Sequence, residues 1–338
     1  MYPIRPLLFL AALFATGSSH ADWHYDQQAI MGTEIHLQFW VNDDSKAGEI
    51  NRAVMDEFRR IDAALSPYKE NSELSRVNRE AGKGTVTVSP ELAEIIDKSL
   101  HYSDSTGGAF DITFATVGSL YDFRKGQKAD TQTTENLLPA VNYRHIALDK
   151  RKHRLAFKDP RTKIDLGGIA KGYSVDRAVA ILQSFGVHNA SVSAGGDARL
   201  LGDKRGKPWL IGIRHPRDKS KNAAVIPLEN TAISTSGDYE RFFIDSDDHR
   251  VHHIFNPATG LPTDTDAGDE DGKQGADQDK LISVSILGPR GFDTDPLSTS
   301  VFVLGKRKGL ALIEQLDGFE AIVIDADHRM FFSSGLQQ

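Results

Sequence analysis

The segment Asp165-Leu-Gly-Gly-Ile-Ala-Lys-Gly172 stands directly before a helical pattern and contains paired glycines. After it, apolar residues recur on one helical face, and the pattern ends at Gly186. The apolar positions are Val175, Ala178, Val179, Leu182 and Phe185. The segment therefore predicts a glycine-rich turn between a strand and a helix that begins near Ile169.

The same apolar spacing indicates two further helices. One spans about Lys46 to Leu65, and the other opens with Ser89 as its N-cap and Pro90 in its first position. Short strands are expected at Glu34 to Trp40, Arg144 to Leu148, Ala190 to Ser193, Trp209 to Ile213, Leu281 to Leu287 and Ala321 to Ile324. Because strands and helices do not alternate regularly, the order favours the α+β class over a doubly wound sheet.

The N-terminus has the pattern of a cleavable signal peptide. Arg5 precedes an apolar run from Leu7 to Phe14, and small residues follow up to Ala21. This run is shorter than the roughly 20 residues of a membrane-spanning helix. We therefore expect residues 1–21 to be a signal peptide, 22–338 to be one exported domain, and the periplasm to be its compartment. A retained N-terminal tether is the alternative.

The composition excludes several kinds of site and partner. The chain has no cysteine, which excludes disulfides, thiolate metal ligands, a cysteine nucleophile and a lipidated cysteine anchor. The formal net charge is -7, and removal of Arg5 with the leader makes it one unit more negative. A mildly acidic surface gives no electrostatic reason to expect a nucleic-acid partner.

A run of carboxylates from Thr263 to Lys280 contains no large apolar residue. The spacing lacks the glycine and glutamate positions of an EF-hand, so a solvated surface loop is favoured over a calcium site.

Two glycine strings allow both a chemical and a purely conformational interpretation. Asp165 to Gly172 could bring backbone groups close to a phosphate or cation, or could simply form a tight turn. It matches neither a Walker loop nor a dinucleotide fingerprint. In Ser193-Ala-Gly-Gly-Asp197, the aspartate could cap a turn or orient a neighbour.

Three polar strings complete the set of candidates. Asp295-Pro-Leu-Ser-Thr299 places a carboxylate and a hydroxyl on one side of a helical turn, where they suit Mg²⁺ or serve as an ordinary helix cap. His252 and His253 stand before a turn and could supply a base or only surface polarity. Ser234-Thr-Ser-Gly-Asp-Tyr-Glu-Arg241 offers hydroxyls and a guanidinium for ribose or phosphate, or forms a polar turn.

Taken together and in this order, the strings closely resemble the FAD:protein FMN transferase family, also called the ApbE family. The resemblance covers essentially all of residues 22–338. The matching strings are Met31-Gly-Thr33, Leu65-Ser-Pro-Tyr-Lys69, Glu73-Leu-Ser-Arg-Val-Asn78, Gly108-Ala-Phe-Asp-Ile-Thr113, Asp165 to Asp176, Ala194-Gly-Gly-Asp197, Ser234 to Arg241, His253 to Gly260 and Asp295 to Gly305.

This resemblance implies an α+β, T-fold-like domain with an antiparallel-rich sheet core, packed helices and FAD in a cleft between lobes. It implies an enzyme that uses Mg²⁺ to transfer the FMN half of FAD to a threonine hydroxyl of an acceptor protein, with release of AMP. The implied acceptors are membrane electron-transport subunits that display flavin on the same side of the membrane.

The resemblance also implies roles for individual residues. His253 is our candidate for the catalytic group that takes the proton of the attacking hydroxyl, and Asp295 is expected to be the main metal ligand and a catalytic residue that could also orient a neighbouring group. The other implied ligands are the Gly168 carbonyl, Ser298 and Thr299. The residues implied to bind FAD are Met31, Tyr68, Asn78, Ala109, Phe110, Asp111, Asp165, Lys171 and Phe255, with His253 beside them.

Two features depart from the family pattern. Pro296 stands where the family usually has alanine, and it removes a backbone donor that the first turn of a helix can spare. The acidic run from Thr263 to Lys280 resembles an insertion beside the His253 turn. Two alternatives to the transferase remain open: a periplasmic FAD-binding or storage protein, and an FAD pyrophosphatase that yields FMN and AMP.

Overall fold

The computed structural model describes residues 21–246, 248–263 and 279–337. The signal peptide expected at 1–21 and the acidic loop expected at 263–280 fall almost wholly outside these residues. Within the described ranges, no helix is both long and apolar enough to cross a membrane.

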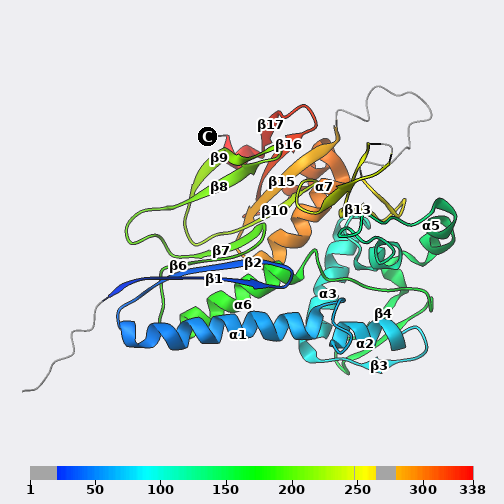
Figure 1. Cartoon of the computed structure of the whole chain (residues 1–338), viewed down its shortest axis with the longest axis horizontal. Helices are drawn as coiled ribbons and strands as arrows, with labels where there is room; N and C mark the ends of the chain where they lie inside the picture. The colour runs from blue at the N-terminus through cyan, green and yellow to red at the C-terminus, as the bar shows by residue number, and fades with distance from the viewer. Residues whose placement is uncertain (1–20, 247, 264–278, 338) are drawn as a thin grey trace, which may run out of the picture.

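An eight-stranded sheet, in which every neighbouring pair is antiparallel, forms the centre of the molecule (Figure 1). Its strands, in spatial order, are β1 (Asp22–Ile30), β2 (Thr33–Val41), β6 (Ala190–Ala194), β7 (Asp197–Leu201), β10 (Ala232–Gly237), β15 (Leu281–Gly288), β16 (Glu320–Asp325) and β17 (Met330–Phe332). The antiparallel sheet expected from the sequence is therefore confirmed.

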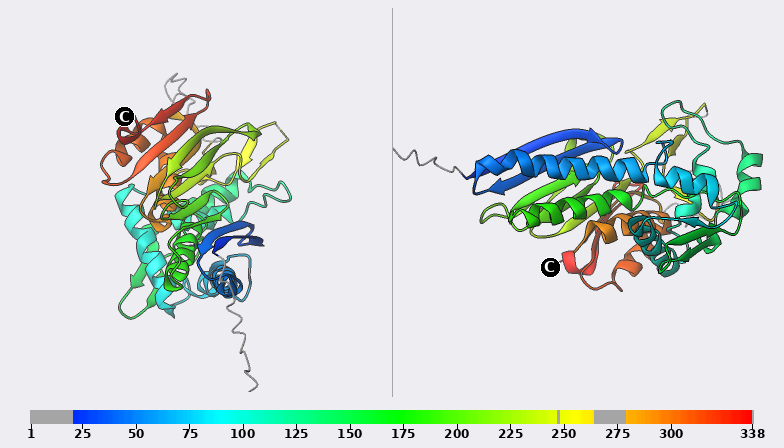
Figure 2. Two further views of the ribbon diagram at one scale, coloured as in Figure 1. Left: turned by 90° about the vertical axis from the view of Figure 1, so that its left-hand side faces the viewer. Right: turned by 90° about the horizontal axis from the view of Figure 1, so that it is seen from below.

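Three long helices lie on one face of this sheet, where α1 and α6 run side by side (Figure 2). They are α1 (Ala47–Leu65), α6 (Ala170–Ser184) and α7 (Gly291–Ile313). The hairpin of β8 (Trp209–His215) and β9 (Asp218–Leu228) covers part of the other face, where Ile213 packs with Ile233 and Leu287. Every residue of β15 is buried; α7 packs on one side of this strand, and on the other side its Leu287 packs with Ile213 of the hairpin.

Smaller elements gather beside this layered core, at the right of Figure 1. The helices are α2 (Glu73–Glu80), α3 (Pro90–Ser105), α4 (Ala115–Gly118) and α5 (Thr131–Leu137). The strands are β3 (Val86–Thr87), β4 (Ile146–Asp149), β5 (Arg154–Phe157), β11 (Phe242–Ile244), β12 (Arg250–His252), β13 (Phe255–Asn256) and β14 (Leu261–Pro262). Short 3₁₀ turns occur at Asp44–Lys46, Ile112–Phe114, Leu138–Ala140, Tyr143–His145 and Ser334–Leu336.

Two local expectations were wrong. The residues before Asp165 form no strand, because Ile164 is hydrogen-bonded to the side chain of Asn78 instead of a neighbouring strand. Pro296 is the sixth residue of α7, so it lies one turn deeper than expected. Nearby hydroxyls turn back to the helix, where Ser298 donates to the Asp295 carbonyl and Ser300 to the Pro296 carbonyl.

The first turns of α6 and α7 cross in close contact at Gly172 and Gly291. A Cβ on Gly172 would lie 2.0 Å from the Gly291 carbonyl oxygen, and a Cβ on Gly291 would lie 2.5 Å from the Gly172 carbonyl oxygen. Neither glycine has a positive φ, so the requirement comes from the approach of two backbones and not from backbone conformation. This crossing is possible only without side chains at both positions.

We predict that Gly172→Ala lowers the free energy of unfolding by about 3 kcal/mol or more, because the methyl group would meet backbone that cannot turn away. Gly48→Ala is the matched control, since Gly48 lies in α1 with open space around it and should gain about 0.5–1 kcal/mol. Urea unfolding measures both. Equal midpoints for Gly172→Ala and the wild type would contradict the close crossing.

Candidate active site

A cavity of about 870 Å³ opens between the α6–α7 crossing and the segments around α2 and α4. Thirteen of the fourteen residues that the resemblance implies for the site line it. They are Met31, Tyr68, Asn78, Ala109, Phe110, Asp111, Asp165, Gly168, Lys171, His253, Phe255, Asp295 and Thr299. Ser298 is buried and does not line the cavity.

The glycine turn before α6 is held from two sides. The Asn78 side chain donates to the Ile164 carbonyl at 2.9 Å and accepts from the Ile164 N–H at 2.8 Å. Asp165 accepts from the Gly167 N–H at 2.6 Å, and burial raises its pKa. Asn78 and Asp165 therefore shape this wall of the cavity as well as lining it.

Two buried carboxylates share one ammonium group at the helix crossing. Lys171 Nζ lies 2.9 Å from Asp197 Oδ2 and 3.5 Å from Asp295 Oδ1. Burial and the neighbouring carboxylate of Asp197 raise the pKa of Asp295, although Lys171 acts in the opposite direction. Burial opposes the charge of Lys171, but Asp197 and Asp295 raise its pKa. This cluster of three side chains therefore contains two carboxyl groups but only one ammonium group.

The remaining proposed metal ligands lie next to these groups. The side chain of Thr299 approaches Gly168, where its Oγ1 would be 3.3 Å from an added Cβ. Ser298 donates to the Asp295 carbonyl and lies 2.8 Å from the Ser236 hydroxyl, so its own hydroxyl is engaged within the protein.

An oxygen set of this kind suits Mg²⁺, which prefers carboxylate and other oxygen ligands. Asp295 Oδ1, the Thr299 hydroxyl and the Gly168 carbonyl could serve, and the excess negative charge of Asp197 and Asp295 favours a cation. No group of three His, Cys, Asp or Glu residues suited to a metal occurs within the described ranges. A metal here would therefore depend on hydroxyl and carbonyl donors.

His253 has one ring nitrogen occupied by the protein. Its Nδ1 lies 3.2 Å from the Arg241 carbonyl oxygen, and this contact requires that Nδ1 carry the proton and donate it. Burial, the Arg241 guanidinium and His252 lower the pKa of His253 to about 3. The imidazole is therefore neutral near pH 7, and Nε2 keeps the lone pair that a general base needs.

Aromatic side chains supply another part of the lining. The Phe255 ring stacks on Phe114 at 5.8 Å and meets the edge of Tyr121 at 4.8 Å, while Phe123 lies 6.5 Å from the ring of His253. Tyr68 lines the cavity and is 85% exposed as a residue, so its ring can stack on a planar ligand.

Two predicted lining residues also have clear structural roles. Both carboxylate oxygens of Asp111 are engaged, because they accept from Thr113 and from the Tyr143 N–H. Burial raises the pKa of Asp111. Met31 adopts a φ of +58° in the tight turn between β1 and β2, which is unusual for a residue other than glycine. Strain of this kind often occurs at functional sites.

Sequence reasoning missed Phe114, Tyr121 and Phe123 as cavity residues and left the role of Asp197 open. The three aromatic residues occupy short, irregular segments without periodicity, so nothing local marked them. Asp197 was expected either to cap a turn or to orient a neighbouring side chain. Its ion pair with Lys171 supports the second role.

Comparison with known proteins agrees with this geometry. Residues 31–323 match the ApbE family. The chain belongs to the ApbE family. It is 31% identical to the FAD:protein FMN transferase of Treponema pallidum over 91% of this chain and 86% of that protein. It is 30% identical to the one from Haemophilus influenzae, over 88% and 85% of the two chains.

Solved structures of family members have the same fold. The ApbE protein of Thermotoga maritima superposes with a TM-score of 0.82 at 28% identity, over 94% of this chain and 98% of that one. The flavin transferase ApbE of Vibrio cholerae gives 0.79 at 26% identity, over 94% and 99%. The family resemblance expected from the sequence is thus confirmed, and with it an enzyme of the transferase class.

We predict that the His253 imidazole does not titrate near pH 6.5, the usual value for histidine. It should remain neutral, with its proton on Nδ1, down to about pH 4, because its pKa is about 3. Long-range ¹H–¹⁵N NMR spectra of the ligand-free protein, with His253→Gln to assign the signal, measure this. A midpoint near 6.5, or a proton on Nε2, would contradict the geometry.

Proposed function

We propose that this protein is a Mg²⁺-dependent FAD:protein FMN transferase, which transfers the FMN half of FAD to a threonine hydroxyl and releases AMP. The observation that carries this proposal is the composition of the cavity. It contains an aromatic surface around Phe255, the Lys171–Asp295 group at the helix crossing, and the free ring nitrogen of His253. The names of the curated relatives support the same activity.

The flavin and the pyrophosphate of FAD need different surroundings, and this cavity offers both aromatic and cationic side chains. The isoalloxazine ring is planar and aromatic with an apolar dimethylbenzene edge, so Tyr68 and the aromatic rings around Phe255 suit it. The pyrophosphate is anionic, so Lys171 and Arg241 suit it. The Arg241 guanidinium forms no ion pair with any carboxylate in the described part of the chain, and thus its charge remains available for phosphate.

Asp295, Thr299 and the Gly168 carbonyl would hold the metal. When bound, Mg²⁺ neutralises charge that develops on phosphoryl oxygens in the transition state. The same residues have a second task in the protein, since Asp295 Oδ2 accepts from the Gly172 N–H at 2.9 Å. Only Oδ1 is then left to face the cavity.

The reaction needs no nucleophile from the enzyme. The acceptor threonine oxygen attacks the phosphorus of the FMN half, the bond to the bridging pyrophosphate oxygen breaks, and AMP leaves with that electron pair. His253 Nε2 takes the threonine proton. Lys171 lies where it can balance charge on the phosphates, and the absence of cysteine is consistent with an external nucleophile.

We further propose that the acceptor is a membrane electron-transport subunit and that transfer takes place in the periplasm. The leader pattern around Arg5 and the apolar run after it support export.

We predict that purified wild-type protein, incubated with FAD, Mg²⁺ and a threonine-bearing acceptor domain, makes the acceptor fluorescent in a denaturing gel. Asp295→Asn should slow labelling by about 10²–10³-fold, because it removes the metal's main charged ligand. The asparagine oxygen can still accept from the Gly172 N–H, so this variant should remain folded. Asp149→Asn, an exposed change on β4, is the control and should label normally.

The assay also separates the alternative functions. AMP release without a labelled acceptor would indicate an FAD pyrophosphatase, in which water replaces the threonine. FAD binding with neither AMP nor label would indicate a storage protein. Full labelling by Asp295→Asn would contradict the proposed metal site.

A further inference from the structure

Asp176 is an acidic residue on α6 that does not line the cavity but binds the start of α7. Its Oδ1 accepts from the Gly291 N–H and its Oδ2 from the Phe292 N–H, each at 2.9 Å. Helix α7 has no capping side chain of its own, because Arg290 makes no such bond. Asp176 therefore satisfies the first two N–H groups of α7, which would otherwise have no partner within the helix.

A carboxylate of α7 likewise accepts a hydrogen bond from a backbone N–H in the first turn of α6. Asp295 stands four residues after Gly291, and its Oδ2 accepts from the Gly172 N–H at 2.9 Å. Asp176 in turn stands four residues after Gly172, and α6 also lacks a local capping side chain. Each helix thus supplies one glycine at the crossing and, one turn later, one carboxylate that caps the other helix. We call these four residues the reciprocal clamp.

We propose that Asp176 is a positioning residue for the transfer reaction, acting through Asp295. This role rests on the proposed function and on the geometry of the reciprocal clamp. Asp295 lies one turn from the end that Asp176 holds, and the next turn carries Thr299 toward Gly168. When Asp176 holds the start of α7, Asp295 Oδ2 is aligned with the Gly172 N–H and Oδ1 faces Lys171.

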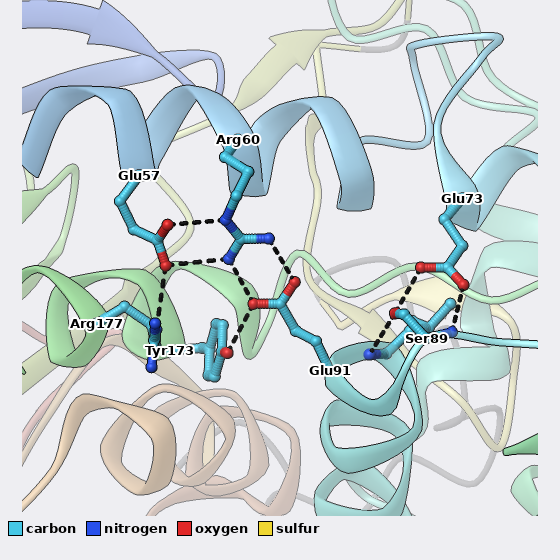
Figure 3. A network of polar contacts seen from close by, with 8 residues as sticks. Glu57, Arg60, Glu73, Ser89, Glu91, Tyr173 and Arg177 are labelled. Carbon is cyan, nitrogen blue, oxygen red and sulfur yellow. Dashed lines mark hydrogen bonds and ion pairs between the residues drawn. The ribbon is translucent and has the colours of Figure 1, made fainter. Parts of the chain in front are cut away.

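A second network on α6 provides a matched control. The Tyr173 hydroxyl donates to Glu91, which also pairs with Arg60, and Arg60 contacts Glu57 (Figure 3). This network joins α6 to α3 and α1. Tyr173→Phe removes its hydrogen bond to Glu91 but keeps the ring that meets Phe292 edge-on at 5.1 Å. It loosens α6 without breaking the reciprocal clamp.

The test compares Asp176→Asn with Tyr173→Phe in the whole protein. Binding of Mn²⁺ to the FAD-loaded protein is followed by water-proton relaxation, and the Mg²⁺ concentration for half-maximal transfer is measured separately. We expect Asp176→Asn to weaken metal binding by about 10–100-fold, as loss of a supporting contact around a metal ligand typically does. Metal-free FAD binding, measured by flavin fluorescence, should stay unchanged, and Tyr173→Phe should leave metal binding unchanged.

The inference would be overturned if Asp176→Asn and Tyr173→Phe bound Mn²⁺ with equal affinity, however much either change destabilises the protein. Asp176 would then serve only as a helix cap. If Asp176→Asn does not fold, Asp176→Glu keeps the charge but displaces it by one methylene, and should shift the metal affinity in the same direction. A wild-type protein that binds Mn²⁺ yet transfers no flavin would overturn the proposed function alone, since the Mn²⁺ comparison still decides the role of Asp176.

Discussion

The contact on which the rest of this structure depends is the exchange of carboxylate caps between α6 and α7. Asp176 holds the N-terminus of α7, Asp295 holds the N-terminus of α6, and the glycines at positions 172 and 291 let the backbones approach. Because α6 packs on β6 and β7 while α7 packs on β10 and β15, the contact also joins two parts of the central sheet. The cavity opens where the two helices begin.

This arrangement explains why the polar centre of the cavity is electrostatically unusual. Asp295, which caps the neighbouring helix, is buried, and burial raises its pKa. Asp197 adds a second buried carboxylate, whereas Lys171 supplies a single ammonium. The fold thus places two carboxylates beside one ammonium and disfavours the ionised form of Asp295, which a cation bound beside anionic phosphates would favour. Asp295 therefore has two roles, since it caps α6 and is also the main ligand of the proposed metal site.

Local patterns in the sequence were enough to predict α1, α3, α6 and the buried strand β15, because each depends on its own periodicity. They could not show that Asn78 replaces a strand partner for Ile164, or that Asp176 reaches α7, because those contacts join residues far apart in the chain. The glycines at 167, 168 and 172 looked alike in the sequence. Only the structure shows that the glycines at 167 and 168 belong to the turn, whereas Gly172 allows the two helices to cross. The structure also places Pro296 one turn deeper in α7 than expected.

The most direct test of this account is a crystal structure of the protein with FAD and Mn²⁺, in which anomalous scattering locates the metal. The account predicts a peak bound by Asp295 Oδ1, the Thr299 hydroxyl and the Gly168 carbonyl, while Asp295 Oδ2 still accepts from the Gly172 N–H. A metal bound elsewhere in the cavity, or an Asp295 side chain turned away from Gly172, would contradict it.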